Sequence, residues 1–332
     1  MYRFIVGTGR CGSTLLSKMI RENEQVASIF EYFSGLDPNQ CYSLEPLDAE
    51  SFAALHCKAS TITSMVLERG YPIAEVSYPF DAPGARFSRH SGIPSILGAT
   101  LSSFPVEDPD ALYEEVRTFM LSLPPRPAAD QHLAFFEWIV ERLGKRVWVE
   151  RSGGSIHHLG ELNTLFPDAR FLHIHRAGEE VALSMREHHV FRLGISLMYG
   201  LQPGPRDSQR DAQAADARNG DPISQLLESH PAAEHFGSAW TDQLLRGFRA
   251  LRKLDARQYR ELRFEDLIEH PLEVLEEAVD FLELPNPRGS WRVRAAALVQ
   301  GAPTPRADQL PADERERLEQ ACRAGNRLLG RA

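Results

Sequence analysis

The sequence predicts a three-layer α/β/α fold with a central, mostly parallel sheet, a phosphate-binding loop (P-loop), and an insertion of helices and loops that covers the site. Short apolar runs with β-branched residues alternate with segments whose apolar residues recur at helical spacing. A glycine-rich turn joins the first predicted strand to the first predicted helix. Strands that alternate with helices pair in parallel, and the helices then cover both faces of the sheet.

The first 20 residues are predicted to bind an anion. The run FIV at residues 4–6 predicts a strand, and apolar residues at helical spacing over 15–20 predict a helix. Between them lies GTGRCG at residues 7–12, whose glycines let the backbone approach an anion closely. The free N–H groups and the dipole of the following helix add positive charge at the same point.

This turn fits two known loop patterns. Residues 7–12 match the GxGxxG dinucleotide fingerprint, and residues 7–14 match a P-loop in which Ser13 replaces the lysine. ATP or GTP hydrolysis is disfavoured, because that lysine must reach the β- and γ-phosphates. The cation of this loop is Arg10, and Ser13 and Thr14 add hydroxyl groups that suit phosphate. A P-loop small-molecule kinase and a Rossmann NAD-dependent enzyme stay open as alternatives.

Composition predicts one domain over residues 1–332, with 42% hydrophobic and 25% charged residues. The net charge of −9 disfavours a nucleic-acid partner. No apolar run reaches the about 20 residues of a membrane helix, and the first strand leaves no room for a signal peptide, so we expect a cytoplasmic location. The four cysteines form no CxxC pair, which argues against disulfides and a zinc site.

The next predicted strand, residues 25–30, places Glu31 at its carboxyl end. Ligands of parallel sheets lie beyond the carboxyl ends of the strands, so we expect Glu31 beside Arg10. Residues 34–129 contain short helical stretches, 48–56 and 110–122, between loops rich in Gly and Pro. We interpret this segment as an insertion that lies over the site and binds the substrate.

A second anion site is predicted in the middle of the chain. A strand over 170–175 leads into Arg176, and a helix over 179–187 carries Ser184. A guanidinium and a hydroxyl at this spacing can hold one phosphate together.

The other elements complete the predicted alternation. They are a helix over 134–143, a strand over 146–150 that ends before Arg151, a helix over 157–166, a flexible loop over 203–221, a helix over 232–254, a strand over 259–264, and helices over 271–282 and 312–329. Arginines of the tail, such as Arg306, are expected to be mostly solvated, with one available to hold a nucleotide. The histidine pairs are predicted to be packed side chains, because none has metal-ligand spacing.

These residues and motifs resemble the sulfotransferase family that uses 3′-phosphoadenosine 5′-phosphosulfate (PAPS), in particular its bacterial small-molecule and tyrosylprotein branches. The family's first loop, PKSGTT or PRSGST, is similar to GRCGST at residues 9–14. Its RDPRDVAVS motif is similar to RAGEEVALS at 176–184, and its YEDL and FLGL motifs to FEDL at 264–267 and FLEL at 281–284. The resemblance covers the first 31 residues and 147–284. It does not include the family's C-terminal Arg-Lys-Gly loop.

The resemblance implies in-line transfer of a sulfuryl group from PAPS to a hydroxyl of a small-molecule, lipid or carrier-bound acceptor, without a metal. By this resemblance Arg10 is the catalytic cation, Glu31 is the general base, and Arg151 takes the place of a lysine in the family's Lys-Thr-Pro turn. His90, and also His56, are alternative bases, and His90 is expected to contact the acceptor together with Glu31.

The implied donor site uses both loops. The residues that would hold the 5′-phosphosulfate are Arg10, Cys11, Gly12, Ser13 and Thr14, and those that would hold the 3′-phosphate are Arg176 and Ser184. The product would be adenosine 3′,5′-bisphosphate (PAP). A catalytically inactive PAP-binding scaffold is a further alternative.

Overall fold

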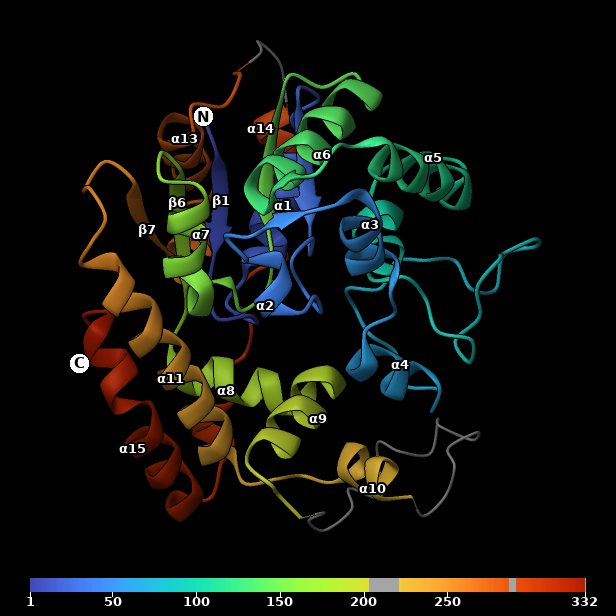
Figure 1. Cartoon of the computed structure of the whole chain (residues 1–332). Helices are drawn as coiled ribbons and strands as arrows, with labels where there is room; N and C mark the ends of the chain where they lie inside the picture. Colours follow the sequence, from blue (N-terminus) through green and yellow to red (C-terminus); the bar gives the residue numbers. More distant parts are fainter. Residues whose placement is uncertain (203–220, 287–290, 332) are drawn as a thin grey trace.

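A computed structural model describes residues 1–202, 221–286 and 291–331. Within these residues the central sheet has five strands, all parallel, in the order β2-β5-β1-β6-β7 (Figure 1). The strands are β1 (Arg3–Val6), β2 (Val26–Phe30), β5 (Val147–Arg151), β6 (Arg170–His175) and β7 (Tyr259–Arg263). The predicted three-layer α/β fold with a parallel sheet is confirmed. The predicted flexible loop over 203–221 lies outside the described residues except for Asp221, which caps the helix that follows.

The register of the sheet brings three strand ends to one edge. Arg151, the last residue of β5, pairs with Ile5 of β1 on one side and with Phe30 of β2 on the other. The turn after β1, Glu31 after β2 and Arg151 therefore lie at the same carboxyl edge, which is where parallel sheets bind ligands.

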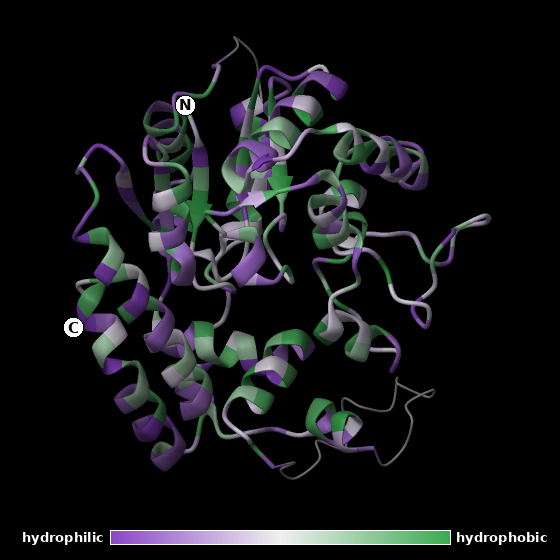
Figure 2. Ribbon diagram, viewed as in Figure 1, coloured by the Kyte–Doolittle hydropathy of each residue, from purple (hydrophilic) through white to green (hydrophobic). Residues whose placement is uncertain are grey.

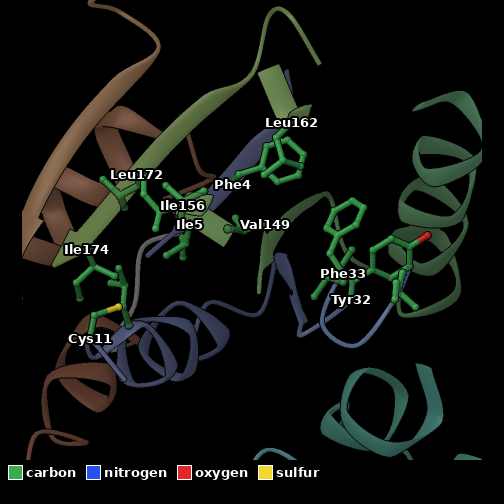
Figure 3. Packing of buried hydrophobic residues seen from close by; sticks show 14 of the residues in the cluster. Phe4, Ile5, Cys11, Tyr32, Phe33, Val149, Ile156, Leu162, Leu172 and Ile174 are labelled. Carbon is green, nitrogen blue, oxygen red and sulfur yellow. The ribbon is translucent and has the colours of Figure 1, made fainter. Parts of the chain in front are cut away.

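Helices cover both faces of the sheet. On one face α1 (Ser13–Arg21) packs against β2 and α14 (Trp291–Ala296), and α13 (Pro271–Phe281) packs against α14 and β6. On the other face lie α6 (Ala128–Arg142) and α7 (Leu159–Leu165), separated from the sheet by an aromatic cluster. In that cluster the ring of Trp148 lies 5.6 Å from Phe4 and 4.6 Å from Phe136. Figure 3 shows part of this core, including Phe4.

A second helical group packs beside the sheet. The helices α8 (Gly178–Glu187), α11 (Ala233–Leu251) and α15 (Ala312–Leu328) contact one another, and α15 carries a polar outer face (Figures 1 and 2). The remaining elements of this half are η3 (Ser155–His158), α9 (His189–Met198), α10 (Pro222–Glu228), α12 (Phe264–Glu269) and η5 (Ala307–Gln309). No described helix is both long enough and apolar enough to cross a bilayer.

The segment over 34–129 forms a separate group of short elements. They are α2 (Pro38–Cys41), β3 (Pro46–Leu47), α3 (Ala49–Cys57), α4 (Thr61–Leu67), η1 (Ile96–Thr100), η2 (Leu101–Ser103), α5 (Pro109–Ser122) and β4 (Arg126–Pro127). The short strands β3 and β4 pair antiparallel, which brings the two ends of the segment side by side.

Most predicted elements are confirmed to within a few residues, and the strand over 170–175 matches its prediction fully. Among the helices that the sequence did not predict are α4, α9, α10 and α14. The sequence of α9, HVFRLGISLM, is a short and largely apolar run with β-branched residues, and a run of this kind is ambiguous between a helix and a strand. The other three helices have only 6 or 7 residues each, which is too short for a clear periodic signal.

His56, predicted as an alternative base, belongs to a buried hydrogen-bond network. Nε2 of His132 lies 2.9 Å from the carbonyl of Cys41, which can only accept, so this nitrogen carries the proton. Nδ1 of His132 then accepts from the Tyr32 hydroxyl at 2.8 Å, and that hydroxyl accepts from Nε2 of His56 at 3.0 Å. Both rings are fully buried, and burial lowers the pKa of each histidine, so both rings are neutral; the prediction that His56 serves as a base is not supported by its position.

This network predicts acid sensitivity. Burial lowers the pKa of His132 to about 4, whereas an unfolded histidine titrates near its ordinary pKa of about 6.5. Between these values the unfolded state binds more protons, so its free energy falls relative to the folded state as the pH drops. Between pH 6.5 and 4, we expect the preferential protonation of His132 in the unfolded state to lower the free energy of unfolding by about 3 kcal/mol.

Urea unfolding at several pH values measures this effect. Because carboxylates also titrate below pH 5, the slope between pH 6.5 and 5 is compared with that of His132→Asn, which removes the titrating ring. Equal slopes for the two proteins would show that His132 does not control acid stability.

Candidate functional site

The glycine-rich turn between β1 and α1 presents unused hydrogen-bond donors. Gly9 and Gly12 have φ of 74° and 96°, and a Cβ at Gly12 would lie 2.1 Å from the ring of Phe264. The backbone N–H groups of residues 9–14 donate no hydrogen bond to another described residue. The first turn of α1 also contains no acidic residue. The predicted anion site is therefore built as a cradle of free N–H groups at a helix N-terminus.

Arg10 follows Gly9 in the left-handed conformation, with φ of 53°, and its side chain is 29% exposed. Its Nε donates to the Ser184 hydroxyl at 3.2 Å, and its Nη1 donates to Oε1 of Glu75 at 3.0 Å. Ser184, predicted to pair with Arg176, thus lies beside Arg10, and no hydrogen bond among the described residues joins it to Arg176.

Glu75 and His188 complete the surroundings of Arg10. Oε2 of Glu75 lies 2.8 Å from Nε2 of His188. Burial raises the pKa of Glu75, but the hydrogen bond and charge of His188 and the charge of Arg10 outweigh it and lower this pKa to about 2. Glu75 is therefore ionised. No sequence pattern indicated either residue, because Glu75 lies in an irregular loop more than 60 positions from its partners.

Arg151 joins the glycine-rich turn to Glu31. Its Nε donates to the Ser13 hydroxyl at 2.9 Å, and its other nitrogens donate to the Thr14 hydroxyl and to Oε1 of Glu31. The guanidinium also lies 4.8 Å from the centre of the Phe30 ring. Arg151 is almost completely buried, so this network orients its charge toward the turn.

Glu31 is held from three sides at the end of β2. Besides Arg151, its carboxylate accepts from the backbone N–H of Gly153 at 2.9 Å and from the Ser34 hydroxyl. Glu150 precedes Arg151 on β5, and burial raises the pKa of its carboxyl group to about 8. Glu150 is therefore mostly protonated at neutral pH and adds little negative charge beside Glu31.

Arg176 belongs to a second cationic cluster. Its guanidinium lies 4.9 Å from the centre of the Phe264 ring, and its Nη2 donates to Oε2 of Glu180 at 3.2 Å. Oε1 of Glu180 accepts from the backbone N–H groups of Arg306 and Ala307, at 2.7 and 3.1 Å. Burial lowers the pKa of Arg176, and the nearby charge of Arg306 acts in the same direction. A second cation, brought by the C-terminal segment, thus lies near Arg176.

Phe264 connects the two clusters. One side of its ring packs on Gly12 and the Arg176 guanidinium lies over it. Cys11 is close enough to Arg176 to affect its pKa, and Figure 3 shows the Cys11 side chain beside Ile174 of β6. The two predicted anion sites therefore flank the same turn.

A cavity of about 350 Å³ opens beside Arg10 and Glu31. One end is polar and is lined by Arg10, Glu31, Glu75, Arg151 and His188. The walls are mostly apolar and include Ile62, Ile73, Val76, Ile93, Pro94, Val190 and Phe191. We call this the main cavity. Many of its wall residues come from the segment over 34–129.

His90, predicted at the acceptor, is exposed and is not among the described residues that line the main cavity. The loop that carries His90 forms other contacts: Nη1 of the neighbouring Arg89 lies 2.7 Å from Oδ1 of Asp81. Within the described part of the chain, no group of three or more His, Cys, Asp or Glu side chains is arranged to hold a metal ion.

Comparison with known proteins gives a structural likeness to sulfotransferases. No family model and no curated protein matches the chain. The sulfotransferase domain from the curacin biosynthetic pathway superposes with a TM-score of 0.46 at 15% identity, over 96% of each chain. The sulfotransferase domain from the Synechococcus PCC 7002 olefin synthase has a TM-score of 0.44 at 16% identity, over 96% of this chain and 86% of that one. Sulfotransferase STF9 from Mycobacterium avium has a TM-score of 0.47 at 14% identity, over 98% and 76%. Likeness at this level does not assign an activity.

Proposed function

We propose that this protein transfers a sulfuryl group from PAPS to a hydroxyl group of an acceptor bound in the main cavity. The observation that carries the proposal is the placement of two cationic clusters on either side of one glycine-rich turn. Arg10 and Arg151 lie on the cavity side, and Arg176 lies on the other side of Gly12 across Phe264. A nucleotide with phosphate groups at two separate positions matches this arrangement of charge.

The residues of the turn fit the 5′-phosphosulfate of such a donor. The free N–H groups of residues 9–14 and the hydroxyls of Ser13 and Thr14 would hold it. On the other side, Arg176 and Arg306 would hold the 3′-phosphate together with the hydroxyl of Ser184, which accepts a hydrogen bond from Arg10. The lack of a lysine at Ser13 disfavours ATP and thus a kinase.

The chemistry follows from what each side chain can do. When bound, the donor supplies a sulfuryl group carried on a phosphate leaving group. Glu31 accepts the proton of the acceptor hydroxyl as its oxygen attacks sulfur and the bond between sulfur and the phosphate oxygen breaks. Arg10 and Arg151 stabilise the negative charge that develops on the transferred group and on the leaving oxygen. The hydrogen bonds around Glu31 and Arg151 keep both side chains oriented before the reaction.

Thermal stabilisation by PAP, ATP and NAD tests the donor. A ligand present at 100 times its Kd stabilises the native state by about 2.7 kcal/mol, so we expect PAP to raise the melting temperature by several degrees and ATP and NAD to have little effect. Stabilisation by ATP or NAD, but not by PAP, would instead favour the kinase or the dehydrogenase. If PAP binds but no labelled sulfate is transferred from PAPS to any acceptor, the protein is a catalytically inactive PAP-binding scaffold.

Glu75 is expected to compete with the donor for Arg10. Its carboxylate lies 3.0 Å from Nη1 of Arg10 and is ionised, so it repels an anionic ligand of the same arginine. A partly exposed ion pair is worth up to about 1 kcal/mol, which corresponds to about fivefold in affinity. We therefore expect Glu75→Gln to bind PAP about fivefold more tightly, measured by calorimetry at low ionic strength. Weaker binding would show that Glu75 is needed to orient Arg10.

A further inference from the structure

Glu31 has a backbone conformation that is unusual for a residue other than glycine. Its φ is 55°, in the left-handed region, and among the described residues other than glycine only Arg10 and Glu283 also have a positive φ. An L-residue rarely adopts this conformation by itself, so the surrounding structure must hold it there. The groups that fix this turn therefore determine where the Glu31 carboxylate points.

The strand β5 approaches this turn with side chains on both faces of the sheet. Successive residues of a strand point to opposite faces. Arg151 points toward α1, since its Nε donates to the Ser13 hydroxyl at 2.9 Å. Glu150 is on the other face together with Trp148, whose ring lies 4.6 Å from that of Phe136 in α6. Neighbouring residues of one strand are therefore available to hold the turn from two sides.

On the α6 side, Ser152 and Glu150 are linked to the backbone of the turn. Oγ of Ser152 accepts from the backbone N–H of Phe33 at 2.9 Å and donates to Oε1 of Glu150 at 2.5 Å. Both side chains are buried, so a lost bond in this chain would leave a polar group unsatisfied. Phe33 follows Glu31 by two residues, and the chain of hydrogen bonds therefore fixes the backbone directly after the left-handed residue.

Glu150 acts in this chain as a hydrogen-bond acceptor. Its Oε1 carries the contact with Ser152, and its Oε2 has no hydrogen-bond partner among the described residues. Because burial raises its pKa to about 8, the carboxyl group is mostly neutral at pH 7 and adds no full negative charge beside Glu31. Glutamine would keep both the shape and an accepting oxygen, whereas methionine has a similar length but no oxygen.

We propose that Ser152 and Glu150 are positioning residues that hold the Glu31 carboxylate in place to accept a proton. Neither of them lines the main cavity, and they act through the backbone of Phe33. The catalytic consequence rests on the proposed function, whereas the order of the turn does not require transfer.

Amide hydrogen exchange tests the proposal without turnover. The N–H of Gly153 donates to Glu31 at 2.9 Å, so its exchange rate reports a displacement of this carboxylate. We expect Glu150→Met to accelerate exchange at Phe33 and Gly153 about tenfold, the effect of losing about one hydrogen bond, and Glu150→Gln to leave both rates unchanged. The amide of Leu172, in the centre of the sheet, is the reference for opening of the whole fold. Exchange in Glu150→Met that is unchanged at Phe33 and Gly153, or raised equally at Leu172, would overturn the proposal.

Sulfuryl transfer from labelled PAPS to 1-octanol, an alcohol that suits the apolar walls of the main cavity, measures the catalytic consequence. Ser152→Ala should lower kcat about tenfold, because a small displacement of a reacting group is costly, and should leave the Kd for PAP unchanged. Adding Glu150→Met should lower kcat no further, since the two side chains act in one chain of hydrogen bonds. Glu150→Gln should retain most of kcat, which would not be so if Glu150 were itself the base.

Ser229→Ala is the matched control. Ser229 is also buried, its hydroxyl donates to the carbonyl of Leu226 at 2.8 Å, and it does not line the main cavity. This variant loses one buried hydrogen bond and should keep its kcat. A normal kcat in Ser152→Ala, or a large loss in Glu150→Gln, would overturn the positioning role. If the unaltered protein binds no PAP and transfers no sulfate, the proposed function fails, and the exchange rates still decide whether Ser152 and Glu150 hold the turn.

Discussion

Replacement of Arg10 by alanine is expected to reduce sulfuryl transfer about 1,000-fold, the loss typical of removing one preorganised donor to a developing negative charge. The guanidinium reaches the main cavity from the turn that would hold the donor, and it donates hydrogen bonds to Ser184 and Glu75. The rate of transfer from labelled PAPS, at saturating donor, measures the effect. The fold should persist, because the Arg10 side chain is partly exposed.

Arg257→Ala is a matched control, since Arg257 is 89% exposed and lies before β7, at the edge of the sheet opposite the site. It should keep full activity. Melting temperatures of both variants separate a catalytic loss from unfolding. An Arg10→Ala protein that melts normally and retains more than about a tenth of its activity would exclude the electrostatic role assigned to Arg10.

Replacement of Glu31 by glutamine is expected to reduce turnover about 100-fold, because a general base typically contributes this much or more. Glutamine keeps the size of the side chain and an oxygen for Arg151 and Gly153, but it cannot accept the proton. The loss should appear in kcat while the Kd for PAP changes little.

Glu316→Gln, on the exposed face of α15, makes the same chemical change far from the cavity and should leave kcat unaltered. Full activity of Glu31→Gln would transfer the role of base to a histidine. The structure then favours His188, which lines the main cavity and is hydrogen-bonded to Glu75, over His56 and His90.

The sequence predicted those parts of the site that depend on contiguous residues. A strand, a glycine-rich turn and a helix follow one another over residues 3–21, so the anion cradle could be inferred from local patterns. Arg176, Glu31 and Arg151 each end or follow a strand. Because parallel strands present their carboxyl ends at one edge, their convergence followed from the fold class.

Loops and distant contacts could not be predicted in this way. His90 was proposed because some members of the family use a histidine as base, but its side chain lies on the surface. Glu75 contacts Arg10 across 65 positions, and Glu180 meets the backbone of Arg306 across 126 positions. No local sequence pattern predicts such contacts, since they arise from the packing of segments that share no periodic signal.

By itself the sequence determined the three-layer fold, the glycine-rich turn between β1 and α1, and the edge at which the charged residues gather, because these depend on hydrophobic period, glycine placement and the direction of parallel strands. The tertiary structure alone decided the order β2-β5-β1, which places Arg151 against both Ser13 and Glu31. It also decided which parts of the chain form the main cavity. The wall of this cavity combines residues more than 100 positions apart, and only the packing of the folded chain brings such residues together.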